Sequence, residues 1–394
     1  MPPSTPIRPR SLPSAQLPDL TGTTVENGRL QLLALLGTGG FAKVYKAFDT
    51  LSSDYHAVKC LARRKPGSRG DINLRHEIRN HTQVSHLPGV VTLHRSFLEG
   101  AYIFIVLELC DMDLHRLVID QQRCAGRPDV AKRIFLEIVD VLDACHAAGV
   151  SHRDLKPGNI LCDADGRNIR LADFGVATCA AESTQFGVGT PVFASPESLD
   201  RDRESYSTRG ADSWALGIIF IALLTSSLPW RVPVDSDRRF AAYRSDPANL
   251  LRRMLDLTPA FSCLLNRIFH PDQRRRPGLE QLRTDVLAME RFLVGSSSGQ
   301  CVSKSHSRSL NSSPRIGAIV FKPNPMYAFA AVVPPPVNSE QPSPLGKSNP
   351  ASDSTSETSV SSRRSTKSLL ALTRRLKKLV LPSGFSKSED SRSA

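Results

Sequence analysis

The sequence contains no long apolar run and no closely spaced cysteine pairs. Its longest apolar stretch, residues 215–224, is interrupted by Gly217 and is too short to cross a bilayer, so it predicts a buried helix rather than a transmembrane segment. The eight cysteines are scattered, and none form a C-x-x-C pair, which indicates neither a zinc site nor a disulfide framework. This usage favours a reducing compartment, and we expect a cytoplasmic or nuclear protein. The N-terminus lacks an apolar core segment, which argues against a secretory signal.

Acidic residues are scarce near the C-terminal end. The formal net charge is +13 over 394 residues. Residues 295–394 contain 14 Lys or Arg against 5 Asp or Glu, a surplus of +9, whereas residues 1–28 carry two charges of each sign. The basic character therefore belongs mostly to the tail. No recognition module accompanies that charge, so we do not expect sequence-specific nucleic-acid binding.

Composition divides the chain into three parts. Residues 1–28 are rich in Pro, Ser and Thr and predict a disordered leader, and residues 29–293 predict a folded domain. Residues 294–394, rich in Ser, Pro and basic residues, predict a disordered tail. Within it, residues 367–381 combine apolar residues at helical spacing with basic ones. This segment has three open interpretations: contact with an anionic membrane, contact with a partner such as an import receptor, or a solvated tail without function.

Two short polar motifs carry most of the chemical information. Residues 151–159 read Ser-His-Arg-Asp-Leu-Lys-Pro-Gly-Asn, and residues 173–175 read Asp-Phe-Gly. Two carboxylates, a lysine and an amide on short loops meet the needs of phosphoryl transfer. Together the motifs resemble the catalytic and metal-binding loops of eukaryotic protein kinases. The resemblance implies an α+β, two-lobed fold, with a β-rich lobe at 29–106, a hinge at 107–111 and a helical lobe at 112–293.

The resemblance also implies a role for each polar side chain of the two motifs. Asp154 is expected to position the substrate hydroxyl as a base, and Lys156 to stabilise the developing charge. Asn159 and Asp173 are expected to hold Mg²⁺, so the implied cofactors are ATP and Mg²⁺. His152 is expected to pack structurally rather than to transfer protons.

A glycine-rich stretch, residues 37–44, lies between two predicted strands. Glycines there let the backbone close over phosphates, although the same pattern also occurs in ordinary hairpins. A strand rather than a helix follows, which argues against a dinucleotide fold. Ala42 replaces the third glycine of the family pattern. The resemblance assigns these residues to the nucleotide: Leu36, Gly37, Gly39, Gly40 and Val44.

The next predicted strand contains Ala57 and Lys59. A lysine on a strand is usually a solvated edge residue, and only its spacing from the glycine-rich stretch distinguishes Lys59. The resemblance assigns Ala57 to the adenine and Lys59 to the α- and β-phosphates. It further assigns Glu77, on the following helix, as the ion-pair partner of Lys59.

Residues 101–109 form a continuous apolar run that predicts a strand leading into the hinge. By resemblance, Leu107 limits the depth of the nucleotide pocket. Asp113 has two interpretations, a contact to the ribose hydroxyls or a helix cap before Leu114. The further nucleotide assignments in this region and beyond it are Glu108, Cys110 and Leu161.

Residues 130–149 show the helical period of a buried face and end at Gly149. This helix is expected to deliver the catalytic loop. Its apolar positions are Ile134, Phe135, Ile138, Val141, Leu142 and Cys145.

The segment that follows the Asp-Phe-Gly motif resembles the activation segment of the family. Lys156 and Thr190 together indicate serine/threonine rather than tyrosine specificity. Phosphorylated Ser183 or Thr184 is one expected partner of Arg153. A polar loop without that role is the alternative.

Further along the chain, structural roles are implied for three residues. Asp212 is expected to brace the backbone of the catalytic loop. Glu197 is expected to pair with Arg274, the first residue of the run Arg274-Arg275-Arg276, and breaking such a buried pair costs about 3–5 kcal/mol. The arginine run could instead form a surface patch for acidic partners.

The sequence therefore predicts a serine/threonine protein kinase that transfers the γ-phosphoryl group of Mg-ATP to protein substrates, acts in signalling and is monomeric. The alternative is a catalytically silent kinase fold used as a scaffold, but such proteins usually lack the lysine or one of the two aspartates. Residues 228–231, 240–247 and 264–269 narrow the resemblance to fungal nutrient-signalling and meiosis-controlling kinases. Gly158 stands where kinases that select basic substrates often have an acid, which argues against a strong basic preference.

Overall fold

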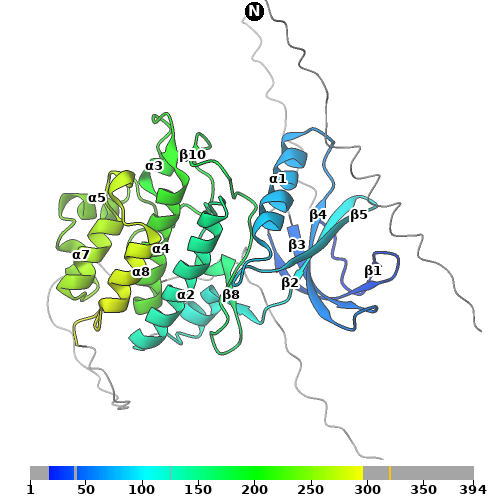
Figure 1. Cartoon of the computed structure of the whole chain (residues 1–394), viewed down its shortest axis with the longest axis horizontal. Coiled ribbons are helices and arrows are strands. Elements are labelled where there is room, and N and C mark those ends of the chain that lie inside the picture. The colour runs from blue at the N-terminus through cyan, green and yellow to red at the C-terminus, as the bar shows by residue number, and fades with distance from the viewer. Residues whose placement is uncertain (1–16, 40–41, 125, 296–318, 321–394) are drawn as a thin grey trace, which may run out of the picture. The chain divides into compact units, whose positions relative to one another are not determined.

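The structure, a computed structural model, describes residues 17–39, 42–124, 126–295 and 319–320, all of which belong to one unit of the chain. Figure 1 shows two parts within it, a β-sheet with one helix beside it and a group of helices.

A six-stranded antiparallel sheet, in the order β1-β2-β3-β4-β6-β5, forms the N-terminal lobe. In β2, buried Leu30 and Leu32 alternate with exposed Gln31 and Leu33, the period expected when one face of a strand covers a core. The strands are β1 (Thr24–Val25), β2 (Leu30–Thr38), β3 (Ala42–Asp49), β4 (Tyr55–Ala62), β5 (Leu93–Glu99) and β6 (Tyr102–Glu108).

The helix α1 (Arg69–Val84) lies beside this sheet (Figure 1). Ser68 caps it, because the Ser68 hydroxyl accepts a hydrogen bond from the amide of Asp71. Asp71 also places a negative charge in the first turn, where it complements the helix dipole. The helix therefore begins at a defined point, which fixes the position of Glu77 two turns later.

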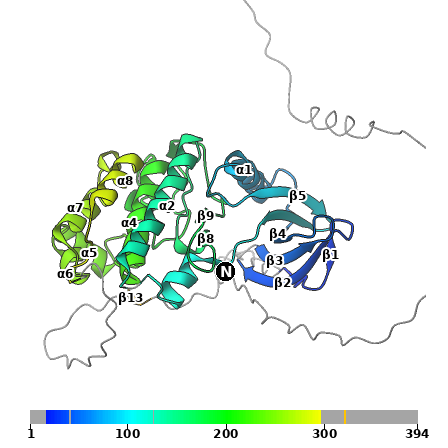
Figure 2. The same ribbon diagram turned by 60° about the horizontal axis from the view of Figure 1, so that its bottom comes forward.

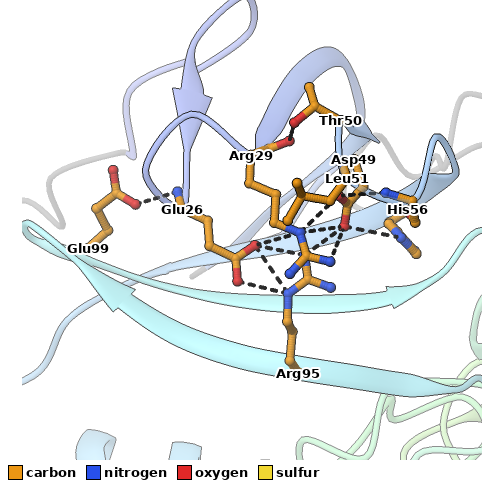
Figure 3. Close-up of polar contacts among 9 residues, drawn as sticks. Glu26, Arg29, Asp49, Thr50, Leu51, His56, Arg95 and Glu99 are labelled. Atoms are coloured by element: carbon orange, nitrogen blue, oxygen red, sulfur yellow. Dashed lines mark hydrogen bonds and ion pairs between the residues drawn. The ribbon is translucent and has the colours of Figure 1, made fainter. Parts of the chain in front are cut away.

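The first strand corrects the predicted start of the ordered domain. We expected a disordered leader up to residue 28, but Thr24–Val25 pair with Gln31 and Leu30 of β2. The reason is a cluster of charges contributed by distant segments. Figure 3 shows the carboxylate of Asp49 bonded to the guanidinium groups of both Arg29 and Arg95, and Arg95 also binds Glu26. These pairs attach the segment before residue 29 to the sheet.

The C-terminal lobe consists mainly of helices and short turns. They are the π-helical turn η1 (Arg116–Asp120), α2 (Pro128–Ala147), the 3-10 turn η2 (Pro157–Asn159), α3 (Pro196–Leu199), α4 (Thr208–Thr225), α5 (Arg238–Ser245), α6 (Leu250–Met254), α7 (Pro259–Ile268), the 3-10 turn η3 (Gln273–Arg275) and α8 (Leu279–Ala288).

The two long helices confirm the predictions made for them. All six apolar positions predicted to face the core from residues 130–149 are buried in α2. Residues 215–224 lie within α4 and are all buried. The helices meet at Phe135 and Phe220, whose rings stack with centroids 3.9 Å apart. Gly217 is needed on α4, because a Cβ there would lie 2.6 Å from the ring of Phe269.

Three short sheets complete the lobe, and Figure 2 shows β8 and β9 between the helices and the large sheet. They contain β7 (Met112–Asp113) with β8 (Ile160–Cys162) and β9 (Arg170–Leu171), β10 (Glu182–Ser183) with β11 (Tyr206–Ser207), and β12 (Ser227–Leu228) with β13 (Ile319–Val320).

The strand β13 falls within the tail that we predicted to be disordered. Ile319 and Val320 are β-branched residues, which favour strands, and they pair with the edge formed by Leu228 and Ser227. Ile319–Val320 and residues 294–295 are the described part of the predicted tail. The basic segment 367–381 lies outside the described residues.

None of the helices in the described ranges is long and apolar enough to span a membrane. Seven cysteines fall in the described ranges, and each is a free thiol.

Candidate active site

The carboxylate of Asp154 is held from four directions. Its Oδ1 accepts hydrogen bonds from the amide and the hydroxyl of Thr190, at 2.8 and 2.7 Å. Its Oδ2 accepts from Lys156 Nζ at 2.7 Å and from Asn159 Nδ2 at 3.1 Å. Lys156 Nζ also donates to the Thr190 hydroxyl at 2.9 Å. The structure thus brings together all four residues predicted to be catalytic.

The loop that carries Asp154 is fixed by Asp212 at the start of α4. Asp212 is 1 % exposed, and its carboxylate accepts hydrogen bonds from the amides of His152 and Arg153, at 2.8 and 2.7 Å. Arg153 has a φ of +64°, a left-handed conformation that costs a non-glycine residue energy and needs such support. The predicted bracing role of Asp212 is confirmed.

The predicted structural role of His152 agrees with its surroundings. The ring is fully buried, donates from Nε2 to the carbonyl of Ala172 at 2.9 Å, and lies 5.0 Å from the ring of Phe174. His152 therefore links the catalytic loop to the Asp-Phe-Gly motif.

Lys59 connects the two lobes. Its Nζ donates to Glu77 at 2.6 Å and to Asp173 at 2.9 Å, so the predicted ion pair with Glu77 is present. Burial alone would lower the pKa of Lys59, but the carboxylates of Asp173 and Glu77 outweigh it and raise that pKa above its ordinary value. In turn, the charge of Lys59 holds the pKa of Asp173 well below its usual range. Both groups therefore remain charged over the physiological pH range.

A cavity of about 370 Å³ opens between the lobes, a size suited to a small-molecule cofactor. It is lined by Asp154, Lys156 and Asn159, which were predicted to be catalytic, together with Asp173. The other predicted nucleotide residues that line it are Gly37, Gly39, Val44, Ala57, Lys59, Glu77, Glu108 and Leu161.

Three nucleotide assignments are not supported by this cavity. Of the described residues assigned from the sequence, Leu36, Cys110 and Asp113 are not among those that line it. Leu36 is buried in the sheet at 5 % exposure, and burial raises the pKa of the Cys110 thiol to about 12. The carboxylate of Asp113 accepts from the amide of Arg116 at 2.9 Å, so the helix-cap interpretation is confirmed. Gly40 lies outside the described residues.

Some lining residues were missed from the sequence. Ile105 lines the cavity on the same strand as Leu107, and the period of two along β6 would have indicated it. Val91 and Ala172 also line the cavity. They come from connecting segments, where no periodic pattern marks a side chain as facing a ligand.

The side chains of Asn159 and Asp173, the predicted metal ligands, suit Mg²⁺. The amide nitrogen of Asn159 donates to the backbone and carboxylate of Asp154, so its side-chain oxygen is the atom that can act as a metal ligand. Asp173 supplies a carboxylate, and such hard oxygen ligands suit magnesium. No group of three or more His, Cys, Asp or Glu suited to a metal occurs among the described residues. One carboxylate and one amide agree with a metal that is held partly by substrate phosphates.

The partner of Glu197 corrects a prediction. Arg276, not Arg274, forms the buried pair, with Nη2 donating to Glu197 Oε2 at 2.8 Å. Asp272 caps the turn η3 through the amide of Arg274 and leaves Arg274 exposed, whereas Arg276 emerges after the turn and points inward over the ring of Trp214. Three consecutive arginines carry no pattern that would have identified the inward one.

The activation segment packs against Arg153. Arg153 Nη1 donates to the hydroxyl of Ser183 at 2.9 Å, and Nη2 donates to Gln185 Oε1 at 3.0 Å. Ser183 is buried, whereas Thr184 is exposed and lines a separate cavity of about 520 Å³ together with Arg153 and Arg201. The structure thus places Ser183 and Thr184 in different environments.

Comparison with known proteins agrees with this geometry. Residues 30–287 match the family model described as "Protein kinase domain". The chain is 31 % identical over 291 residues to the "Negative regulator of sexual conjugation and meiosis" of Schizosaccharomyces pombe, covering 68 % of this chain and 62 % of the relative. It is 34 % identical over 250 residues to "CBL-interacting protein kinase 4" of Oryza sativa subsp. japonica, covering 59 % of this chain and 54 % of the relative.

The chain therefore spans less than two thirds of the length of these relatives. The first of them is a fungal meiosis regulator, which agrees with the group indicated by the sequence. The family model covers well over half of the chain, and the two-lobed α+β fold and the catalytic motifs agree with it. The chain belongs to the protein kinase family.

Proposed function

We propose that the chain is an active serine/threonine protein kinase that acts in signalling. The observation that carries the proposal is the set of hydrogen bonds around Asp154, which is complete in the structure. A base must lie within hydrogen-bond reach of the proton that it takes. Here one carboxylate is oriented by Thr190, Lys156 and Asn159, and it lines the cleft together with Lys156 and Asn159.

In the proposed reaction, Asp154 orients the hydroxyl of a substrate serine or threonine and accepts its proton as the oxygen bonds to phosphorus. Bound Mg-ATP supplies the γ-phosphoryl group and the metal charge, and ADP leaves. Lys156 provides positive charge beside the transferred group, and Lys59 provides it at the other side of the cleft. Glu77 keeps Lys59 in place.

Serine/threonine specificity rests on Thr190. Its hydroxyl lies between Asp154 and Lys156, within 2.9 Å of each, and so occupies the space beside the base. We infer that a short hydroxyl side chain reaches Asp154 there and that the longer tyrosine side chain does not. Proteins bearing such serines or threonines are the proposed partners.

The test is phosphate transfer from labelled ATP with Mg²⁺ to a degenerate peptide library containing Ser, Thr or Tyr. We expect wild-type transfer to Ser and Thr peptides, and a fall of about 10²–10⁴-fold for Asp154→Ala because the base is lost. Asp173→Asn should abolish transfer as well, since it removes a metal ligand and a partner of Lys59. Asp165→Ala, an exposed aspartate of the same lobe, is the matched control and should be unchanged.

ATP binding separates this proposal from the scaffold alternative. Asp154→Ala should still bind ATP, because the Lys59 and Glu77 pair remains. A wild-type chain that binds ATP but transfers no phosphate to any peptide would support the silent scaffold. Equal transfer by wild type and Asp154→Ala would contradict the role given to Asp154.

A further inference from the structure

Each of the three guanidinium nitrogens of Arg153 donates to a neutral acceptor. Nε donates to the carbonyl of Val176 at 2.7 Å, Nη1 to the hydroxyl of Ser183 at 2.9 Å, and Nη2 to the side-chain carbonyl of Gln185 at 3.0 Å. Arg153 is therefore already bonded to the start and to the middle of the activation segment without any added negative charge.

Ser183 is the most enclosed of these partners. It is 7 % exposed and lies in β10, which pairs with Tyr206–Ser207 of β11. Its hydroxyl oxygen accepts a second hydrogen bond from the amide of Gln185 at 3.1 Å. A hydroxyl fits this position, whereas a side chain that is only 7 % exposed leaves little room for a phosphoryl group. Thr184, one residue later, faces solvent.

Further hydrogen bonds fix the activation segment on both sides of Ser183. The amide of Thr208 donates to Ala181 at 2.9 Å, and the hydroxyl of Tyr206 donates to the carbonyl of Gln185 at 3.1 Å. The amide of Gly187 donates to Ser198 at 2.8 Å. The activation segment is thus held in place between the Asp-Phe-Gly motif and Thr190. The contact of Thr190 with Asp154 depends on the position of this segment.

We propose that Ser183 is a positioning residue whose unmodified hydroxyl holds Arg153 and the activation segment in the arrangement that places Thr190 on Asp154. The proposal rests on the proposed kinase function. It implies that the chain transfers phosphate without prior phosphorylation of its activation segment. The sequence left two interpretations of this segment, a phosphorylated partner of Arg153 and a polar loop without that role. For Ser183 the proposal excludes the first, because Ser183 acts as a hydroxyl and not as a site of phosphorylation.

The test uses the full chain co-expressed with a phosphatase and checked by intact mass before and after short assays. The variants are Ser183→Ala and, as a matched control that loses the same hydroxyl one residue later, Thr184→Ala. We expect the unphosphorylated wild type to be active and Ser183→Ala to lose about tenfold in kcat, the effect of one hydrogen bond to a charged group. The KM for ATP should not change, because the cleft is untouched. Thr184→Ala should stay within about twofold of wild type.

Two results would overturn the proposal. One is an unphosphorylated wild type that is inactive and gains more than tenfold when Ser183 or Thr184 is phosphorylated. The other is a Ser183→Ala variant with the wild-type kcat. A general loss of folding is distinguished by the melting temperature, which should stay close to that of the wild type.

Hydrogen exchange tests the contact independently of catalysis. The amide of Gln185 donates to the Ser183 hydroxyl, so its exchange should rise at least fivefold in Ser183→Ala and remain unchanged in Thr184→Ala. Unchanged exchange in Ser183→Ala would contradict the positioning role. If no variant transfers phosphate in any phosphorylation state while exchange changes as expected, the positioning contact stands and the proposed function fails.

Discussion

Asp49 in the β-rich lobe and Asp212 in the helical lobe are both almost completely buried carboxylates, yet their negative charges are stabilised in different ways. Asp49 accepts from Arg29 Nε at 2.9 Å and from Arg95 Nη2 at 3.0 Å (Figure 3). Asp212 accepts from the backbone amides of His152 and Arg153 and from His146 Nε2 at 2.8 Å. One carboxylate binds charged side chains, and the other binds mainly the backbone of a functional loop.

The difference separates stability from catalysis. The arginines around Asp49 are partly exposed, at 30 % and 24 %, so water can solvate them when the carboxylate is lost. The amides that bind Asp212 are enclosed, and they belong to the residues directly before Asp154. Changes at Asp49 should therefore affect the free energy of unfolding alone, whereas changes at Asp212 should also affect the position of the base.

The largest expected effect on catalysis among these buried carboxylates is that of Asp212→Asn. The amide nitrogen of the new side chain would face a backbone N–H or His146, leaving a buried donor unpaired at a cost of about 1–3 kcal/mol. Displacement of the loop by about 1 Å should lower kcat about 10²-fold. Steady-state kinetics and urea unfolding measure the two effects. A variant with reduced stability and wild-type kcat would show that Asp212, like Asp49, contributes to stability alone.

Arg276→Gln extends the comparison to a third buried carboxylate, Glu197, which is 2 % exposed. Loss of its guanidinium partner leaves a buried charge uncompensated, so we expect a loss of about 3–5 kcal/mol in the free energy of unfolding. Arg274→Gln is the matched control, because that exposed side chain should contribute less than about 0.5 kcal/mol. Equal losses in the two variants, measured by urea unfolding, would argue against the observed pairing.

The same three carboxylates show what could be predicted from the sequence. The role of Asp212 was predicted because it belongs to a motif whose spacing fixes its place relative to the catalytic loop. Glu197 was predicted to be paired, but the partner depends on how the turn η3 rotates three consecutive arginines. The Asp49 cluster was not predicted, because it joins residues up to 69 positions apart that share no local pattern.

The activation segment also contains a difference that the sequence alone could not predict. Ser183 and Thr184 are adjacent and chemically alike, and they were predicted as equivalent candidates. Ser183 is buried where β10 pairs with β11, whereas Thr184 lies just beyond the end of β10 and is exposed. The partner strand lies more than twenty residues away, so the sequence alone could not indicate which hydroxyl is enclosed.

Asp49→Asn should have a smaller effect than Arg276→Gln and should leave catalysis unchanged. We expect a loss of about 2–3 kcal/mol in the free energy of unfolding, below the usual range for a broken buried pair because the two arginines reach solvent. Urea unfolding and steady-state kinetics measure it, and Asp54→Asn, an exposed aspartate of the same hairpin, is the control. A fall of tenfold or more in kcat would show that the cluster also positions the active site.

The smallest expected effect is the pH dependence of the contribution of Asp49. Hydrogen bonds from Arg29 hold the pKa of Asp49 well below its usual range, against the opposing effect of burial. A carboxylate with a depressed pKa in the folded state stabilises the fold fully above its unfolded pKa, about 4, and loses that contribution as the pH falls further. His56 Nε2 lies 3.9 Å from Asp49, so both chains should carry His56→Gln to remove its titration.

In that background, the difference in unfolding free energy between Asp49 and Asp49→Asn should stay constant from pH 7 to pH 5. It should then shrink by about 1 kcal/mol for each pH unit below 4, because one pKa unit corresponds to about 1.4 kcal/mol. Urea unfolding at half-unit steps measures this difference. A difference in unfolding free energy that stays constant down to pH 3 would mean that Asp49 keeps an ordinary pKa in the folded state. Arg29 and Arg95 would then stabilise the fold through packing contacts rather than through their charge.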